Sequence, residues 1–446
     1  MKKTEIILGE FFIPETPGKV RSGTFNFSKD DRMVLDLGGY INSTEDRKIS
    51  VPIIYGTDSK SGDRISLVNC QCLPGWPNEV SYLVNEVYTG DWVDKVTDDI
   101  YHSIEMEMTG LSEWFRERIS VLQQSGEESI DAKHWEKCWQ IDSDTELILK
   151  YFMTETHQGH GLLFKPEHLI RIKCKRLLSR KKLYNMGVSV RNFLGVFLRN
   201  VPEILSMSFA KGDDSLVHLY IRHFLDKEED DIVGKRSLFY DLETYLPGAL
   251  KQWFKNPKLL DQILFLYITS KEITIAEIAF TEITIALEIF HKHFLQPKDE
   301  EENRTIKQDV LLRMQNESIS ESSRKSNQRW TQRMRYVHMW MELEKIPFFK
   351  DLWKSPFQYI LKLNESRNYY THYERESNES AKDNISLVWT SNQLFYKNIE
   401  LRMWLKGLLL NYLYIHPAGI GIIINMQHKS YFYIDYESNE YSINNL

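Results

Sequence analysis

The pattern of apolar residues changes once along the 446 residues of this chain, near position 235. Before this point, short apolar runs follow the two-residue period of β-strands, and after it they recur at the spacing of helical turns. Strands and helices bury their apolar residues in different cores, so the change indicates two domains. We therefore predict an α+β multidomain protein: a β-rich sandwich-like or barrel-like domain at residues 1–235, then an all-α helical bundle at residues 236–446.

The first part of the chain holds short runs rich in β-branched and aromatic residues, each bounded by turn residues such as Gly38-Gly39 and Pro74-Gly75. Helices interrupt this pattern at residues 112–122, where Ser112 is a candidate N-cap, and at residues 189–198. An acidic loop is expected at residues 226–231. The predicted strands are residues 24–27, 33–37, 65–70, 80–84, 147–152, 169–174 and 216–224.

Residues 259–296 contain neither glycine nor proline. The repeated pentapeptide Glu-Ile-Thr-Ile-Ala favours a strand locally, but strands seldom exceed about ten residues, so the length predicts a nearly unbroken helix. Pro417 is predicted to stop the last long helix, and the tail beyond it to add strands or pack on the bundle. The other predictions for this half of the chain are polar linkers at residues 298–303 and 318–326 and helices at residues 329–343, 355–370 and 392–414.

Bulk properties exclude several classes of protein. A net charge of −7 argues against indiscriminate coating of nucleic acid. No signal peptide and no membrane-spanning apolar run is visible, so we expect a cytoplasmic protein without a membrane partner. Four cysteines are too few for a disulfide framework in a chain of this length. The pair Cys70 and Cys72 lacks the two further ligands of a zinc site, so we expect these two residues to be ordinary core or surface cysteines. Phosphate-binding and dinucleotide motifs are missing, and we expect neither a metal nor a cofactor.

A basic segment stands out against this acidic background. Residues 165–200 carry ten lysines and arginines but a single acid, Glu167. Its central residues are Lys173, Lys175, Arg176, Arg180, Lys181 and Lys182. One interpretation is a surface that binds RNA phosphates, and the other is a solvated strand and turn whose charges pair with the acidic loop after residue 226.

A cation, an amide and an imidazole lie close together at Arg367, Asn368 and His372. Arginine stabilises negative charge and histidine transfers protons near neutral pH, which suits cleavage of an RNA phosphodiester. On a continuous helix Asn368 and His372 share a face, so the amide could hold the imidazole. Alternatively the helix ends near Tyr370 and His372 lies in the following turn. Three tyrosines, Tyr369, Tyr370 and Tyr373, could stack on bases or belong to the core.

The spacing alone does not identify a site, because Arg333 and His338 repeat it without the asparagine. Two such matches are about what chance produces in a chain of this composition. A further pair, His291 and His293, falls on different faces of a helix, and both are predicted to lie at the surface.

Several short stretches resemble known proteins. Arginine-asparagine followed by histidine near the end of a helix resembles the signature of HEPN ribonucleases. The start of the chain, residues 9–14 and 23–25, resembles the opening of the ApeA family of anti-phage HEPN proteins, and residues 111–115 and Ala286-Leu287-Glu288 are similar to further landmarks of that family.

The resemblance implies a HEPN-like C-terminal bundle that acts as a metal-independent endoribonuclease in abortive infection, with RNA such as tRNA as substrate. It also implies a homodimer or higher homo-oligomer formed through this bundle, a sensing or substrate-guiding N-terminal domain, and a phage-derived trigger. It favours the RNA-binding interpretation of the basic segment. The alternative is a catalytically silent HEPN module that binds a nucleotide, RNA or a protein partner.

Residue roles follow from the same resemblance. His372 would take the proton of the 2′-hydroxyl or protonate the 5′-oxygen leaving group, and Arg367 would stabilise the charged phosphorane. Asn368 would orient His372 or bind a phosphate oxygen. The products would carry 2′,3′-cyclic phosphate and 5′-hydroxyl ends.

Overall fold

The chain divides into two compact units. The first comprises Met1–Arg191 and Pro202–Phe239, and the second comprises Asn192–Val201 and Tyr240–Leu446. Strands dominate the first and helices the second, which confirms the predicted α+β order. The computed structural model describes residues 5–27, 33–41, 50–73, 80–93, 100–111, 134–158, 161–198, 201–211, 216–221, 243–317, 329–352, 356–371 and 387–428.

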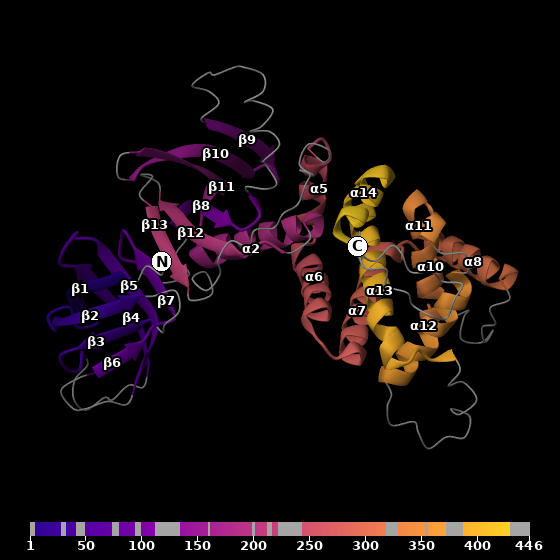
Figure 1. Cartoon of the computed structure of the whole chain (residues 1–446), viewed down its shortest axis with the longest axis horizontal. Helices are drawn as coiled ribbons and strands as arrows, with labels where there is room; N and C mark the ends of the chain where they lie inside the picture. The colour runs from indigo at the N-terminus through magenta and orange to yellow at the C-terminus, as the bar shows by residue number, and fades with distance from the viewer. Residues whose placement is uncertain are drawn as a thin grey trace. The chain divides into compact units, whose positions relative to one another are not determined.

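Six antiparallel strands of the first unit close into a barrel (Figure 1). They follow the order β4-β1-β2-β3-β6-β5, and β5 pairs back onto β4, which completes the ring. Closure leaves these strands without a free edge. Their bounds are β1 (Glu5–Phe12), β2 (Arg21–Phe27), β3 (Val34–Leu37), β4 (Ser50–Asp58), β5 (Arg64–Cys72) and β6 (Val80–Leu83).

Alternate residues of these strands fill the barrel, as a two-residue period requires. Phe11, Phe25, Leu35 and Tyr82 are among the fully or almost fully buried side chains of this core. The ring of Phe11 lies against Gly56, where an added Cβ would stand 2.5 Å from the ring carbon Cε1. Glycine at this position therefore makes room for an aromatic side chain in a narrow barrel.

The sheet continues beyond the barrel, because β5 also pairs with β7. The strand order from there is β7-β13-β12-β8-β11-β10-β9, and the helix α2 (Arg180–Phe197) follows β11. The bounds are β7 (Glu86–Thr89), β8 (Tyr101–Met108), β9 (His134–Gln140), β10 (Thr145–Gln158), β11 (Gly161–Leu178), β12 (Ile204–Lys211) and β13 (Leu216–Ile221).

Three elements of the first unit, β10, β11 and α2, are longer than the sequence predicts. The strands β10 and β11 are longer than expected, because they pair without interruption from Thr145 and Cys174 to Gln158 and Gly161. The helix α2 begins at Arg180 rather than near residue 189, since the Ser179 hydroxyl accepts a hydrogen bond from the backbone N–H of Lys182 and caps a first turn that is polar in sequence. The helix predicted at 112–122 and the acidic loop at 226–231 lie outside the described residues.

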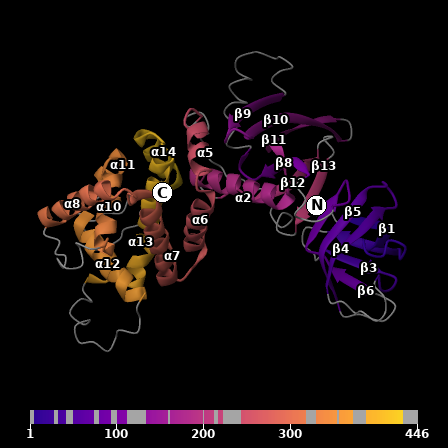
Figure 2. The ribbon, with the colours of Figure 1, turned by 180° about the vertical axis from the view of Figure 1, so that it is seen from behind.

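The second unit contains helices and no strands among its described residues (Figure 2). Pairing of α13 with α7 forms its centre, where the Asn398 amide donates to the Ala276 carbonyl oxygen. The bounds are α5 (Leu246–Trp253), α6 (Pro257–Glu272), α7 (Ala276–Phe290), the π-helical turn η2 (His291–Leu295), α8 (Glu300–Asn316), α10 (Gln332–Glu344), α11 (Pro347–Leu352), α12 (Pro356–Thr371), α13 (Ser391–Tyr412) and α14 (Pro417–His428).

The stretch 259–296 is helical, as predicted, but it is not one helix. Ile273 and Ile275 are extended, with φ and ψ of −72° and 125° and of −81° and 109°, and they separate α6 from α7. The strand preference of these β-branched residues thus acts locally and breaks the helix.

The linker predicted at 298–303 is correct for residues 298–299 and wrong for 300–303, because Asp299 Oδ1 accepts from the backbone N–H groups of Glu301 and Glu302 and starts α8 at Glu300. The linker predicted at 318–326 lies outside the described residues.

Pro417 lies between two helices. The helix α13 ends at Tyr412, close to the predicted end, and α14 starts at Pro417, where a proline needs no N–H partner. The first part of the tail is therefore helical and contacts α11 and α13. None of the helices in the described ranges is long and apolar enough to cross a bilayer.

Candidate active site

The last turns of α12 carry Arg367 and Asn368. Within the described residues α12 extends to Thr371, one residue past Tyr370, and both predicted placements of His372, on the helix or in a following turn, stay predictions. Asn368 is exposed, whereas the Arg367 side chain retains only 21% of its exposure. His372 lies outside the described residues, so its predicted contact with Asn368 stays a prediction.

A glutamate from another helix holds the Arg367 guanidinium. Arg367 Nε donates to Glu288 Oε1 at 2.9 Å, and Nη2 donates to Oε2 at 3.3 Å. This two-point contact uses one edge of the planar group. A third donor, Nη1, lies 3.3 Å from the Thr371 hydroxyl, one helical turn further on. The guanidinium is therefore fixed in orientation from two sides.

The same carboxylate is itself held in place. Gln332 Nε2 donates to Glu288 Oε1 at 2.7 Å and to the Tyr336 hydroxyl at 3.1 Å. Burial, and then the Glu288 carboxylate, raise the pKa of Tyr336, so this hydroxyl stays protonated. A chain of polar contacts thus connects α10 to α7 and α12 beneath Arg367.

A second ion pair lies between α10 and α12. Arg333 Nη2 contacts Glu365 Oε1 at 2.6 Å, and Asn364 Nδ2 donates to the same oxygen at 3.1 Å. Two arginines and two glutamates of this cluster therefore balance one another. Arg333 is the arginine of the repeated arginine–histidine spacing, and its side chain binds Glu365 in this cluster.

Hydrogen bonds and ring contacts fix the end of α12. The Ser366 hydroxyl accepts from the Trp389 backbone N–H at 2.9 Å, and the Tyr370 hydroxyl donates to the Trp389 carbonyl oxygen at 2.8 Å. Tyr370 also packs edge-on against Phe280 of α7. Tyr370 is therefore a packing residue, while Tyr369 is 39% exposed and Tyr373 lies outside the described residues.

Sequence reasoning noted Glu288 only as a family landmark and missed Gln332, Tyr336 and Thr371. Thr371 could have been found, because a side chain four residues after Arg367 lies on the same helical face. The contacts of Glu288 with Gln332 and Arg367 join helices that are far apart in sequence, so no local pattern predicts them.

The predicted surface position of His291 is wrong. His291 is fully buried and His338 is 3% exposed, and His291 Nε2 lies 3.1 Å from His338 Nδ1. Trp330 stacks on the His338 ring. Burial lowers the pKa of His338 to about 4, and burial followed by the neighbouring His338 lowers that of His291, so both rings are neutral at physiological pH. His338 is therefore a packed core histidine rather than an exposed acid or base.

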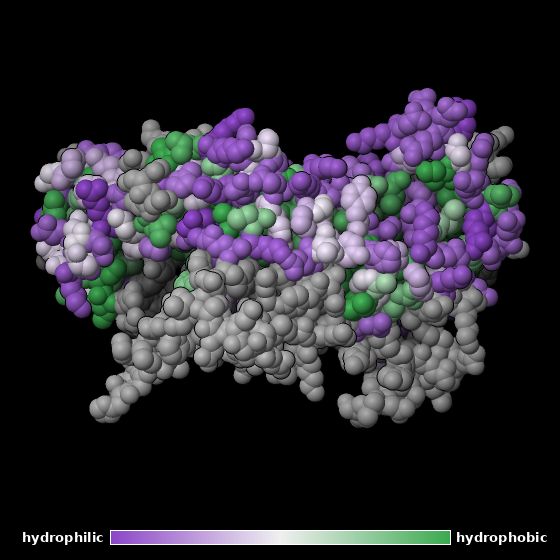
Figure 3. Space-filling view, turned by 90° about the horizontal axis from the view of Figure 1, so that it is seen from above, coloured by the Kyte–Doolittle hydropathy of each residue, from purple (hydrophilic) through white to green (hydrophobic). Residues whose placement is uncertain are grey.

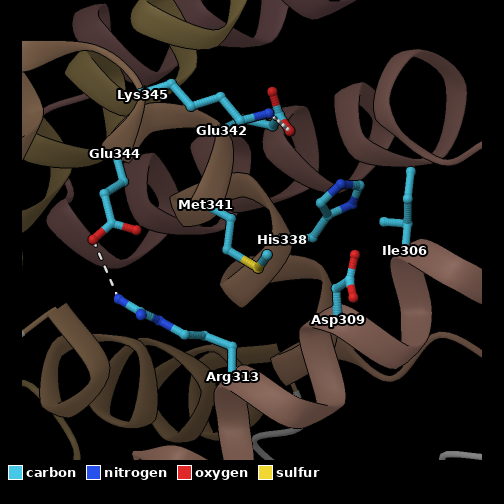
Figure 4. A pocket seen from close by; sticks show the side chains of 8 residues that line it. All are labelled: Ile306, Asp309, Arg313, His338, Met341, Glu342, Glu344 and Lys345. Carbon is cyan, nitrogen blue, oxygen red and sulfur yellow. Dashed lines mark hydrogen bonds and ion pairs between the residues drawn. The ribbon is translucent and has the colours of Figure 1, made fainter.

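A pocket of about 430 Å³ lies beside His338, between α8 and α10. Figure 4 shows two ion pairs among its lining side chains, Lys345 with Glu342 and Arg313 with Glu344. Neither Arg367 nor Glu288 lines this pocket. The pocket and the Arg367 cluster are thus separate features of the helical unit.

Five of the six central residues of the basic segment are exposed. The exception is Arg180, which is 2% exposed and lies over the Tyr88 ring at 4.4 Å, so its predicted place on a basic surface is wrong. Arg176 pairs with Asp144 at 2.9 Å, and Lys173 lies opposite Glu146 in the sheet. Acids of the β10 region therefore offset charges on β11, whereas Lys181 and Lys182 project from the start of α2.

The four cysteines differ in exposure: Cys70 and Cys174 are buried, Cys72 is half-buried and Cys138 is exposed. Burial raises the pKa of the Cys70 thiol, and all four cysteines are unpaired thiols in the structure. No cluster of three or more metal-ligand side chains occurs among residues that the structure describes.

Comparison with known proteins adds one finding. The sequence model described as ApeA N-terminal domain 1 matches residues 6–246, which include the barrel, the open sheet and α2. No curated protein and no solved structure matches the chain.

Proposed function

The chain belongs to the ApeA family of anti-phage proteins, and from this premise we propose that its helical unit is a metal-independent HEPN endoribonuclease. The observation that carries the proposal is the environment of Arg367, the arginine of the HEPN-like stretch. A guanidinium held rigidly at the surface end of a helix suits the binding of a phosphate in one orientation.

Some N–H groups of the Arg367 guanidinium are left to bind a substrate. A guanidinium has five N–H groups. Glu288 accepts from Nε and from Nη2, and Thr371 accepts from Nη1, which leaves one N–H on each Nη without a partner among the described residues. We propose that these two N–H groups bind oxygens of a phosphate.

The chemistry assigned to the site is transesterification within RNA. The 2′-oxygen attacks the adjacent phosphorus as it loses its proton, and the bond from phosphorus to the 5′-oxygen breaks as that oxygen gains a proton. His372 serves as base or acid, Arg367 stabilises the charge on the phosphorane, and Asn368 orients His372 or binds a phosphate oxygen. The products carry 2′,3′-cyclic phosphate and 5′-hydroxyl ends.

The reaction needs a base for the 2′-hydroxyl and an acid for the 5′-oxygen, but each chain supplies only one histidine, His372. Two protomers that face each other would supply a base and an acid, so we propose a homodimer or higher homo-oligomer formed through the helical unit. The β-rich unit would sense a phage-derived trigger or guide the RNA, with tRNA as the expected substrate. A strictly monomeric protein that still cleaves RNA contradicts the two-protomer site.

The test is cleavage of total RNA in the presence of EDTA. Wild-type protein should cleave, and Arg367→Ala and His372→Ala should each lose two to three orders of magnitude in rate, about 3–4 kcal/mol of transition-state stabilisation. His338→Gln, with folding verified by circular dichroism, is the matched control at the repeated spacing and should stay active.

Two results contradict the proposal. Near-normal cleavage by His372→Ala with loss in His338→Gln would mean that the active histidine lies at the other spacing. RNA binding without any cleavage by the wild type would support the competing function, a catalytically silent module.

A further inference from the structure

The outer wall of the barrel carries side chains in cross-strand rows. Strand pairing places Leu8, Thr24, Asp36 and Ser81 directly opposite one another on β1, β2, β3 and β6. A neighbouring row contains Ile6, Asn26, Val34 and Leu83. Glu10 and Ser22 form the next pair on the other side. Because side chains two apart on a strand share a face, these rows make one continuous outer surface.

Four of these ten outward-facing residues are aliphatic, although polar residues are expected on the outside of an antiparallel sheet. Ile6 is 61% exposed and Leu8 is 58% exposed, on the same side of β1. Val34 and Leu83 are half-buried beside them. Figure 3 shows hydrophobic residues (green) at the surface of the barrel end of the molecule, among hydrophilic ones. Aliphatic side chains exposed in this way lose contact with water when another molecule covers them.

A groove of about 620 Å³ crosses the same strands, and its lining includes Leu8, Thr24 and Ser81. Its two charged residues are both carboxylates, Glu10 and Asp36, and no lysine or arginine lines it among the described residues. Asp36 accepts a hydrogen bond from the Ser81 hydroxyl at 2.6 Å, which orients its carboxylate. The groove therefore favours cations and repels phosphates.

We propose that this groove binds an extended, basic segment of a protein partner. Glu10 lies one row and two strands away from Asp36, which corresponds to about 12 Å along the wall. Side chains four residues apart in an extended peptide lie at a similar distance, about 13 Å. Two basic side chains at that spacing match the two carboxylates, and an aliphatic side chain halfway between them lies over β2, about 6 Å from the position of Leu8. Nucleic acid is the weaker fit, because both charges would oppose its backbone.

The experiment uses the full chain and three labelled peptides, measured by fluorescence anisotropy. Their cores are Lys-Thr-Val-Thr-Lys, Glu-Thr-Val-Thr-Glu and Gln-Thr-Val-Thr-Gln, which differ only in charge. The basic peptide should bind the wild type at least tenfold more tightly than the acidic one. The double variant Glu10→Lys with Asp36→Lys should reverse this preference, and Leu8→Ser should weaken binding of the basic peptide at unchanged charge.

The matched control is Glu15→Lys, which changes the charge of an exposed residue outside the groove lining and should leave both affinities unaltered. The proposal fails if the basic and acidic peptides bind the wild type equally, if neither binds, or if the double variant behaves as the wild type. It also fails if the double variant gains affinity for a labelled RNA while its peptide binding is unchanged. Circular dichroism establishes that the variants fold. None of these outcomes depends on whether the helical unit cleaves RNA.

Discussion

Acid should destabilise the helical unit through the buried pair of His291 and His338. Both imidazoles are neutral in the folded protein, because burial lowers their pKa below the ordinary value of 6.5, to about 4 for His338. The unfolded chain takes up protons as the pH falls through 6.5, and the folded protein does so only at much lower pH. Stability is therefore fully present above pH 6.5 and is lost as the pH falls towards 4.

The size of the effect follows from the shift. A pH of 5 lies 1.5 units below the histidine pKa of 6.5 in the unfolded chain. Each pH unit between these values corresponds to about 1.4 kcal/mol. His338 alone therefore lowers the free energy of unfolding by about 2 kcal/mol at pH 5 relative to pH 8. His291 adds a loss in the same direction. This is a substantial part of the 5–15 kcal/mol that typically holds a domain folded.

The assay is urea unfolding at several pH values, followed by tryptophan fluorescence, to which Trp330 beside His338 contributes. A double variant, His291→Gln with His338→Gln, keeps neutral hydrogen-bonding groups but cannot titrate. The wild type should lose at least 2 kcal/mol more than this variant between pH 8 and pH 5. His293→Gln, an exposed neighbour, should behave as the wild type. Equal pH dependence in the wild type and the double variant would refute the reasoning.

Three further predictions concern single side chains. Glu288→Gln should lower kcat for RNA cleavage about tenfold, about 1.4 kcal/mol, with little change in KM, because the amide has no charge and only one acceptor oxygen, so Arg367 is held less firmly; an increase in kcat would mean that Glu288 restrains the site instead. Gly56→Ala should destabilise the barrel by about 1–3 kcal/mol in thermal unfolding, because its Cβ would overlap the Phe11 ring, and adding Phe11→Leu should recover part of the loss. Arg180→Ala should lower the stability of the β-rich unit by about 1–2 kcal/mol without changing RNA affinity in a filter-binding assay, because the guanidinium is buried rather than exposed; a loss of RNA binding at unchanged stability would contradict this.

The class of each half of the chain could be predicted from its amino-acid sequence. Side-chain periodicity is a local property, so strands of period 2 and helices of period 3.6 could be recognised without knowing what they pack against. Helix ends were predictable where a local signal exists, as at the end of α13 near Tyr412. The starts of α2 and α8 were not predicted, because they depend on capping contacts of the Ser179 and Asp299 side chains.

Which distant residues contact one another depends on the tertiary structure. Closure of the barrel depends on pairing β4 with β5, and the orientation of Arg367 depends on Glu288, 79 residues earlier in the chain. His291 was misplaced because its surroundings depend on His338, 47 residues away, and on the π-helical turn at which it stands. Arg180 lies over the Tyr88 ring although it belongs to a basic run. Charge and spacing specify what a side chain can do, but its burial and its partners depend on the packing of segments that are distant in sequence.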